Sequence, residues 1–303
     1  MSTRNLADEE LTQAVLSSFS GCRSERFQEI IQSLVRHLHA FASDVELTEE
    51  EWFAGIDFLT QTGHITDDKR QEFILLSDVL GVSMLVVGLN HRKPSVATPS
   101  TVFGPFFVEG SPRVANGEDL ANGAPGERCL VQGRVITVSG EAVPHAHIEV
   151  WQADDDGLYD VQHADLSEPR GRGHLYAGDD GRYCFWSVKP TAYPIPADGP
   201  VGKLLANSNR SPMRPAHIHF MVTARGYQSV TTHVFADGDP YLDSDAVFGV
   251  KSELIAPLTR HQPGRAADGR DLDVPYWSIN YDIVLAPDDA SDMSGRAGGS
   301  SRR

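Results

Sequence analysis

The chain changes character near residue 100, and this change limits the fold more than any other feature of the sequence. Within residues 1–92, apolar side chains recur at helical spacing, as in the run Phe27, Ile30, Ile31, Leu34, Val35 and Leu38. Beyond residue 100, glycine and proline separate short β-rich runs, namely CLVQGRVITV, AHIEVWQ, GRYCFWSV, PAHIHFMVTA, SVTTHVFA and YWSINYDIVLA. The pattern predicts three or four helices followed by a sandwich or barrel of short strands.

Two local signals predict where helices begin. Thr48 is followed three residues later by Glu51, which is the spacing of a capping box. Thr66 precedes Asp67 and Asp68, and acidic residues are favourable at a helix N-terminus. We therefore expect one helix to start at each threonine.

The most apolar stretch, residues 73–89, reads FILLSDVLGVSMLVVGL. Its length is marginal for a membrane span and it contains Asp78, so we predict a buried helix that ends near Asn90. An isolated carboxylate in such a helix is costly unless it has a partner. Asp78 therefore either makes a capping or interface hydrogen bond, or faces a pocket that holds a polar ligand.

Composition excludes several classes of partner. The chain has 26 basic and 42 acidic residues and a formal charge of −16, which argues against nucleic acid and anionic membrane surfaces. Cys22, Cys129 and Cys184 are odd in number and form no CxxC motif, so a disulfide framework or a thiolate zinc site is not expected. The N-terminus is polar and does not resemble a signal peptide, so we expect a cytoplasmic protein.

Histidine pairs are the first chemical signal. His217 and His219 lie two apart in an apolar run, and alternate residues of a strand point to the same face. The two imidazoles either share a metal ion or have separate hydrogen-bond partners. A second pair, His145 and His147, follows Pro144 at the start of a strand, where we expect surface residues.

Two tyrosines occur in unusual settings and are candidate ligands. Tyr159 lies in the acidic turn DDDGLYD, and Tyr193 lies in the proline-rich loop KPTAYPIPADGPVG. Either residue can be a packing residue. If both are phenolate ligands, a hard trivalent ion such as ferric iron fits the charge.

Charged residues near the histidine pair leave further alternatives open. Arg214, three residues before His217, can reach over a metal centre or form a surface ion pair. A zinc or ferrous site would instead combine the histidines with an acid such as Asp237 or Asp239.

Four motifs occur in the order found in one family. The segments TVFGPFFVEGSP, IEVWQ followed by GLYD, AYPIPADGPVG and RPAHIHF resemble the intradiol aromatic-ring dioxygenases, from about residue 20 to about residue 285. The resemblance implies Fe(3+) held by Tyr159, Tyr193, His217 and His219. It also implies that the substrate displaces Tyr193 and that Arg214 stabilises charge developing on the substrate.

The resemblance is closest to the hydroxyquinol branch. Catechol-cleaving members usually carry glutamine where this chain has His233, and DPYLDSDAVFGVK follows it here. We expect His233 to lie behind the metal ligands, with a fifth ligand as the alternative. The implied reaction is cleavage of hydroxyquinol (benzene-1,2,4-triol) by O2 to 3-hydroxy-cis,cis-muconate, with catechol or a chlorocatechol as the alternative substrate. A non-catalytic β-sandwich binding protein is the more remote alternative.

The resemblance also implies a pocket and an assembly. We expect Asp78 to accept a hydrogen bond from the third hydroxyl of hydroxyquinol. The expected pocket residues are Leu75, Asp78, Val102, Phe103, Gly104, Pro105, Phe106, Ile195, Pro196, Arg214, His233 and Val247. The expected fold is mostly β: a helical dimerisation domain over residues 1–98, a β-sandwich catalytic core over 99–286, and a disordered tail over 287–303. The implied assembly is a homodimer joined through the N-terminal helices, with a phospholipid bound between them.

Overall fold

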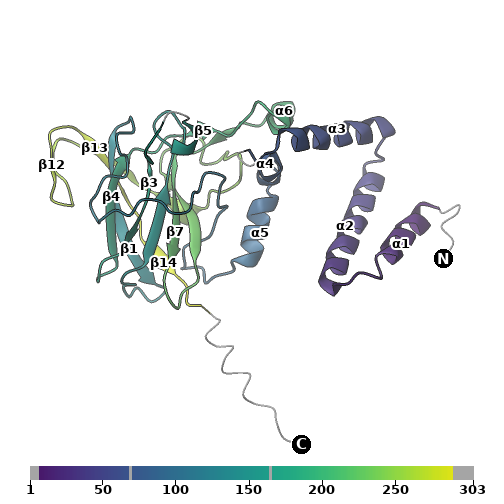
Figure 1. The fold of residues 1–303 in the computed structure, drawn as a ribbon, viewed down its shortest axis with the longest axis horizontal. Coiled ribbons are helices and arrows are strands. Elements are labelled where there is room, and N and C mark those ends of the chain that lie inside the picture. Colours follow the sequence, from purple (N-terminus) through teal and green to yellow (C-terminus); the bar gives the residue numbers. More distant parts are fainter. Residues whose placement is uncertain (1–6, 68–69, 164–165, 289–303) are drawn as a thin grey trace, which may run out of the picture. The chain divides into compact units, whose positions relative to one another are not determined.

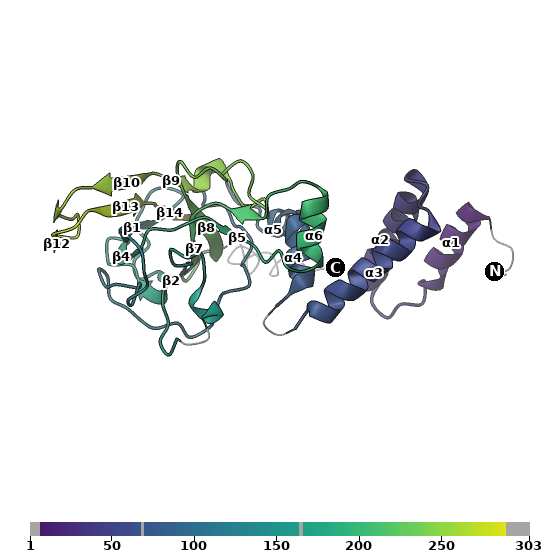
Figure 2. The ribbon, with the colours of Figure 1, turned by 90° about the horizontal axis from the view of Figure 1, so that it is seen from above.

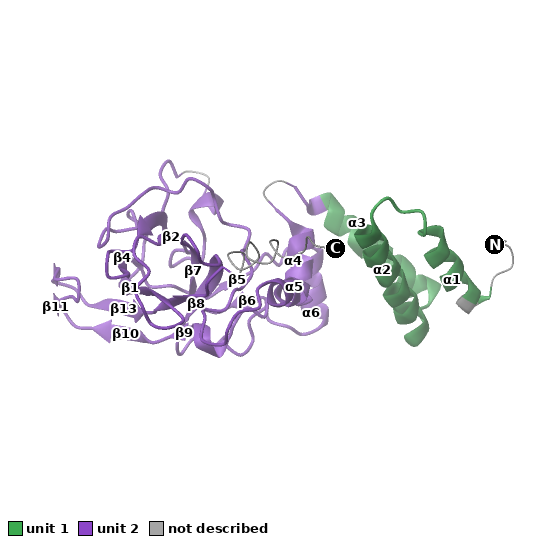
Figure 3. Cartoon of the chain, turned by 90° about the horizontal axis from the view of Figure 1, so that it is seen from below, with its two compact units in different colours: residues 1–64 green, residues 65–303 purple. Residues whose placement is uncertain are grey.

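The computed structural model describes residues 7–67, 70–163 and 166–288. The predicted tail falls almost entirely on residues 289–303, which lie outside the described part. The chain divides into two compact units, residues 1–64 and residues 65–303 (Figure 3). The second unit therefore contains both the last N-terminal helices and all of the strands.

The first unit consists of three helices, α1 (Asp8–Ser18), α2 (Glu25–Asp44) and α3 (Glu49–Ile65). The capping box predicted before α3 is confirmed, because the Glu51 carboxylate accepts the Thr48 backbone N–H and the Thr48 hydroxyl accepts that of Glu51. In α2 only Val35 is buried. Five apolar side chains that recur along the helix are about half exposed, namely Phe27, Ile30, Leu34, Leu38 and Phe41.

The apolar run at residues 73–89 and the residues before it correct three predictions. It forms two helices rather than one, α4 (Glu72–Val79) and α5 (Val82–Asn90), bent by 78°. Gly81 between them has φ +74°, a left-handed conformation that ends α4. The predicted start at Thr66 is also wrong, since α4 begins at Glu72, and in the described ranges five helices rather than three or four precede residue 92.

Burial of this run also differs from the expectation. In the single chain α5 has no buried residue, and Leu85 at 63% is among its most exposed apolar side chains. Over the described ranges no single helix has the length and apolar character to cross a membrane, although the bent pair α4 and α5 meets that test when the two are joined.

Two five-stranded sheets make up most of the second unit (Figure 1). The first sheet has the order β10-β13-β1-β14, with β4 also pairing with β1; the second has the order β3-β2-β7-β8-β9. The strands of the first sheet are β1 (Arg128–Thr137), β4 (Arg182–Val188), β10 (Leu258–His261), β13 (Tyr276–Asn280) and β14 (Ile283–Leu285). Those of the second are β2 (His147–Trp151), β3 (Arg172–Tyr176), β7 (His217–Thr223), β8 (Val230–Ala236) and β9 (Ile255–Ala256).

The core lies between the two sheets. Residues from both, such as Val131 and Phe185 from the first and Ile218 and Phe220 from the second, belong to one buried cluster. The alternate residues of the second sheet therefore point away from this core, on what we call the outer face. Helices and strands contribute comparable lengths to the described chain, so the expectation of a mostly β protein is met only in part.

Shorter elements complete the second unit. Strands β5 (Tyr193–Pro194) and β6 (Met213–Arg214) pair with each other, and helix α6 (Pro200–Asn207) lies in the chain between them. Helix α6 packs against α4, and α4 packs against α5, as Figure 2 shows. The remaining elements are the 3-10 helices η1 (Asp160–Gln162) and η2 (Ser252–Leu254) and the paired strands β11 (Gly264–Arg265) and β12 (Asp271–Leu272).

Candidate active site

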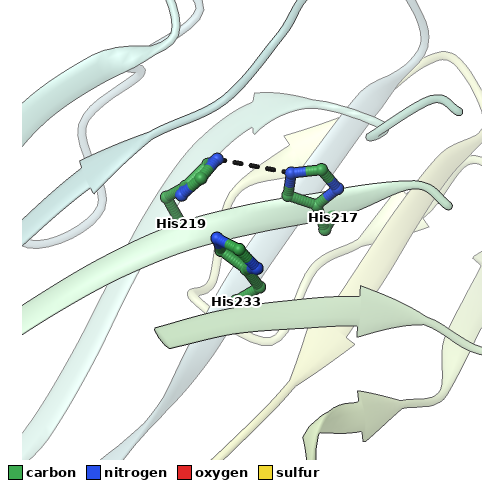
Figure 4. A group of neighbouring side chains, drawn as sticks. All are labelled: His217, His219 and His233. Carbon is green, nitrogen blue, oxygen red and sulfur yellow. Dashed lines mark hydrogen bonds between the residues drawn. The ribbon is translucent and has the colours of Figure 1, made fainter. Parts of the chain in front are cut away.

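Three histidines lie together on the outer face of β7 and β8 (Figure 4). Ile218 enters the core, so His217 and His219 share the opposite face, as predicted. His233 on β8 lies directly opposite His219 in the strand register. The three side chains offer nitrogen atoms that all lie within 4.8 Å of one another.

Hydrogen bonding fixes how His217 presents its ring. Its Nδ1–H donates to the backbone carbonyl of Pro215 at 2.6 Å, so Nε2 is the unprotonated nitrogen that carries the lone pair. Metal-bound histidines commonly donate their second ring nitrogen to a carbonyl in this way. His219 is held differently, by stacking of its ring on Trp151 with 4.7 Å between centroids.

Two turns bring the candidate tyrosines to the histidines. Tyr159 immediately precedes η1, and Phe106 stacks on its ring. Tyr193 begins β5 and pairs with Arg214 of β6. Gly157 allows the two loops to approach, because its φ is +81° and an added Cβ would lie 2.7 Å from the Cβ of Tyr193.

The polar ends of these four side chains converge. The Tyr159 hydroxyl lies 2.9 Å from His219 Nε2 and 3.1 Å from the Tyr193 hydroxyl. His217 Nε2 lies 3.4 Å from the Tyr193 hydroxyl and 3.3 Å from His219 Nε2. Ligand atoms bound to one metal ion at about 2.0–2.3 Å lie roughly 3 Å apart. The four atoms are therefore spaced as the ligands of one ion would be.

Burial sets the protonation of these groups. It lowers the pKa values of His217 and His219 well below the usual range, and the Arg214 guanidinium lowers both further, so both imidazoles are neutral and able to bind a metal. Burial, followed by the neighbouring Tyr193, raises the pKa of Tyr159 well above 10. A bound cation would reverse this shift and favour the phenolate, as the ligand prediction requires.

Arg214 is 4% exposed and lies at the centre of a hydrogen-bond network. Its Nε donates to Asp245 Oδ1, Nη1 to His217 Nε2 and Nη2 to His233 Nδ1, each at 3.2 Å. Asp245 is held in turn by the backbone N–H of Gly249 at 2.8 Å. Arg214 thus forms an ion pair, but a buried one beside the histidines rather than one on the surface.

A cavity of about 560 Å³ opens beside Tyr193 and Arg214. Ten of the twelve expected pocket residues line it: Leu75, Asp78, Val102, Gly104, Pro105, Phe106, Ile195, Pro196, Arg214 and Val247. Phe103 does not, because its ring packs against Phe107 and Trp151. His233 does not either, since it lies behind His219, fully buried.

Asp78 reaches the cavity from α4. It is 6% exposed, and burial raises its pKa, while a hydrogen bond from Ser83 and the charge of Arg214 act in the opposite direction. No lysine or arginine of the described residues forms an ion pair with it. The carboxyl group is therefore available to a ligand in the cavity.

The sequence reasoning missed Glu72, which lines the same cavity and is fully buried. One carboxylate oxygen accepts the backbone N–H of Val201 in α6, and the other accepts the Arg70 Nε–H. Glu72 thus ties α4 to the first turn of α6. Its partner is 129 residues away, so no local pattern signals this role.

The alternative carboxylate ligands do not join the histidines. Asp237 is exposed, and Asp239 accepts the backbone N–H groups of Ala216 and Tyr241. Neither belongs to the metal-compatible groups found among the described residues. A hollow of about 820 Å³ elsewhere, lined partly by Gln132 and Arg134, contains none of the expected site residues.

Comparison with known proteins gives a consistent result. Residues 24–98 match the family model of the catechol dioxygenase N terminus, and residues 102–287 match the dioxygenase model. The hydroxyquinol 1,2-dioxygenase of Nocardioides simplex is 53% identical over 92% of this chain and 96% of that protein. The 6-chlorohydroxyquinol 1,2-dioxygenase of Cupriavidus pinatubonensis is 53% identical over 91% of this chain and 96% of that protein. The solved structure of the hydroxyquinol 1,2-dioxygenase of Pseudomonas putida DLL-E4 has a TM-score of 0.88 and 48% identity, covering 93% of this chain and 99% of that one.

Proposed function

The chain belongs to the intradiol ring-cleavage dioxygenases, and from this premise we propose that it opens the ring of hydroxyquinol with O2. The bond between the two adjacent hydroxyl-bearing carbons breaks, and both atoms of O2 enter the product, 3-hydroxy-cis,cis-muconate, a tautomer of maleylacetate. The observation that carries the proposal is the convergence of two tyrosines and two histidines beside a cavity that contains Arg214 and Asp78.

Iron is the metal of this family, and we assign its ligands to Tyr159, Tyr193, His217 and His219. Two phenol oxygens and two neutral imidazoles at this spacing suit ferric iron, because phenolates favour a hard, highly charged ion. When bound, the ion supplies Lewis acidity that draws electrons from the diol and makes the ring reactive toward O2. We place His233 behind the ligands, where its ring contacts that of His219 and its Nδ1 accepts a hydrogen bond from Arg214.

Tyr193 is proposed as the ligand that the substrate displaces. It lines the cavity, whereas Tyr159 does not, so an entering diol meets Tyr193 first. Once released, the phenolate oxygen of Tyr193 accepts a proton from a substrate hydroxyl. This accounts for one of the two diol protons, and binding as a dianion requires that the second proton pass to another base, such as hydroxide.

Arg214 is proposed to stabilise negative charge as it develops on the substrate. It lines the cavity, and three neighbouring side chains fix all parts of its guanidinium. A permanent cation that needs no reorganisation during the reaction is the arrangement that stabilises a transition state most effectively.

Asp78 is proposed to select hydroxyquinol over catechol. The cavity is otherwise mainly apolar, so a buried carboxyl group without an ion-pair partner favours a substrate with an additional hydroxyl. Relatives named for hydroxyquinol and its 6-chloro derivative support this choice. Catechol and chlorocatechols remain the alternative substrates.

We further propose the expected division into a helical dimerisation domain over residues 1–98 and a β-sandwich catalytic core over 99–286. The exposed apolar side chains of α2 and α5 support a homodimer with bound phospholipid, because apolar surface of this extent usually meets another chain or lipid. The three free cysteines support a reducing, cytoplasmic location.

The decisive experiment is oxygen uptake by the iron-loaded enzyme with hydroxyquinol, catechol and chlorocatechols. We expect the highest kcat/KM for hydroxyquinol, with one O2 consumed per substrate. A preference for catechol would overturn the substrate assignment but not the family chemistry. Absence of uptake with every diol by protein that contains iron would overturn the enzymatic proposal. A reddish colour from phenolate-to-iron charge transfer reports separately on the tyrosine ligands.

A further inference from the structure

A second group of histidine and carboxylate side chains lies on the outer face of the same sheet. His147 and Glu149 are two apart on β2, so their side chains point to one face. His174 on β3 lies directly opposite Glu149 in the strand register. We call these three residues the His147–Glu149–His174 cluster; none of them lines the substrate cavity or contacts the four assigned iron ligands.

The ligand atoms of this cluster are spaced so that small side-chain movements would bring all three to one metal ion. Each residue offers a ligand atom, and the three atoms lie within 4.8 Å of one another. His147 Nε2 is 3.6 Å from Glu149 Oε1, slightly beyond hydrogen-bond distance. The two imidazole rings are 5.0 Å apart between centroids.

The charge of Glu149 is not balanced by a permanent cation. The residue is 7% exposed, and its Oε2 accepts the Ser111 hydroxyl at 2.6 Å. Among the described residues no lysine or arginine forms an ion pair with it. The one basic side chain within ion-pair distance is the imidazole of His147. Burial, joined by the nearby His174, lowers the pKa of His147 despite the opposite effect of Glu149, so this imidazole is uncharged at neutral pH. A buried carboxylate without a cation is costly.

His174 is held in the tautomer that a metal ligand requires. Its Nδ1 lies 2.8 Å from the backbone carbonyl of Ser111, and a carbonyl can only accept, so Nδ1 carries the proton. Nε2 is then the nitrogen with a free lone pair. The residue that positions this ring also donates its hydroxyl to Glu149, so Ser111 orients two members of the cluster. Such outer hydrogen bonds are typical of metal-binding histidines and carboxylates.

We propose that the His147–Glu149–His174 cluster binds a divalent first-row transition-metal ion, such as Zn²⁺, at a site separate from the iron centre. Two imidazoles and one carboxylate form a ligand set that Zn²⁺ accepts, with water in the remaining position. The side chain of His147 is 28% exposed, which gives the ion a route from solvent. The bound ion would join β2, β3 and the segment around Ser111.

The test is a titration of the iron-loaded protein with Zn²⁺ alone, measured by isothermal calorimetry. Elemental analysis after dialysis then gives the metal content per chain. We expect one zinc per chain in addition to iron, with the visible absorption of the iron centre unchanged throughout. His147→Ala and His174→Ala should each weaken zinc binding by about 100-fold or more while iron content stays at the wild-type level. Glu149→Gln, which keeps the Ser111 hydrogen bond possible, should also weaken it.

His145→Ala is the matched control, because His145 is the other member of the HxH pair and its side chain is 72% exposed beside Asp179. It should bind zinc as the wild type does. The proposal is overturned if the wild type binds no zinc beyond iron, if zinc displaces iron, or if the cluster variants and His145→Ala bind zinc equally. If Glu149→Gln does not fold, the partly exposed His147→Ala variant decides the question alone. None of these outcomes depends on which diol the enzyme cleaves.

Discussion

The N-terminal helices and the outer face of the second sheet depart from ordinary burial in opposite ways. The helices expose large apolar side chains, including Phe53 at 65% and Leu85 at 63%. The sheet buries polar ones, including His219 at 1% and His217 at 3%. Exposed apolar surface of this extent favours a protein or lipid partner, whereas converging imidazole and phenol groups favour a cation. The two regions therefore indicate partners of opposite chemistry.

The largest effect is expected when one of the proposed iron ligands is removed from the buried site. Tyr159→Phe and His217→Ala should each abolish iron retention or activity, because three remaining side chains leave the ion underfilled. Iron per chain and oxygen uptake are the measurements. Tyr183→Phe is the matched control: it removes a buried tyrosine hydroxyl that donates only to the carbonyl of Tyr281, and it should keep iron. Full iron content and normal turnover in either ligand variant would refute the assignment.

The next largest effect concerns the buried carboxyl group where helix and cavity meet. Asp78→Leu should lower kcat/KM for hydroxyquinol while preserving or raising that for catechol, because a site built for a hydroxyl can discriminate by as much as roughly 10⁴-fold. The readout is the ratio of the two specificity constants. Asp78→Asn, which keeps a hydrogen-bond acceptor, should change the ratio less than Asp78→Leu. Equal loss with both substrates would remove Asp78 as the selector.

Arg214→Ala should keep iron and colour but lower kcat by about 10²–10³-fold, the usual effect of removing one preorganised charge-stabilising group. The exposed arginine of another ion pair, Arg182 beside Asp180, provides the control variant Arg182→Ala, whose turnover should be unchanged. Turnover of Arg214→Ala within a few-fold of wild type would contradict the role. Loss of iron in this variant would instead make Arg214 a structural residue of the metal site.

The smallest effect on catalysis is expected in the helical region. The double variant Leu34→Glu, Leu38→Glu places charge on the exposed apolar side of α2 and should shift the homodimer toward monomer. Light scattering at micromolar concentration measures the shift, and kcat per iron should change little. Arg36→Glu, on the opposite side of the same helix, adds charge without touching the apolar residues and should remain dimeric. A wild-type monomer would remove the basis of this prediction.

The strands that lie in β-rich runs of the sequence were predictable, and the exceptions have physical causes. The strands β1, β2, β4, β7 and β8 correspond to the β-rich runs of the sequence. The short strand β3, RGHLY, was missed because only one of its side chains, Leu175, enters the main core. The burial of residues 73–89 was misjudged because apolar character indicates that a surface avoids water, but not whether the same chain covers it.

The candidate site was predictable only where its residues share a local pattern. The i, i+2 spacing places His217 and His219 on one face of a strand, whereas joining Tyr159 and Tyr193 to them required the family resemblance. Pairing over long sequence distance explains what was missed, as for Glu72 and α6. Phe103 illustrates another limit, since its neighbours in sequence line the cavity while its own ring turns toward Trp151.

The two-residue pairing of β5 with β6 has a consequence for how this enzyme can diversify. Tyr193 and Arg214 are neighbours across that ladder, so residues 195–212, which include helix α6, form a segment whose two ends are fixed. Ile195 and Pro196 in this segment line the cavity, and neither of them is a metal ligand. Because lengthening an anchored flexible loop costs little closure entropy, roughly 0.6 kcal/mol per doubling, the irregular stretches on either side of α6 can vary in sequence and length while the ladder keeps its register. Evolution can thus alter which ring fits the cavity without disturbing the residues that open it.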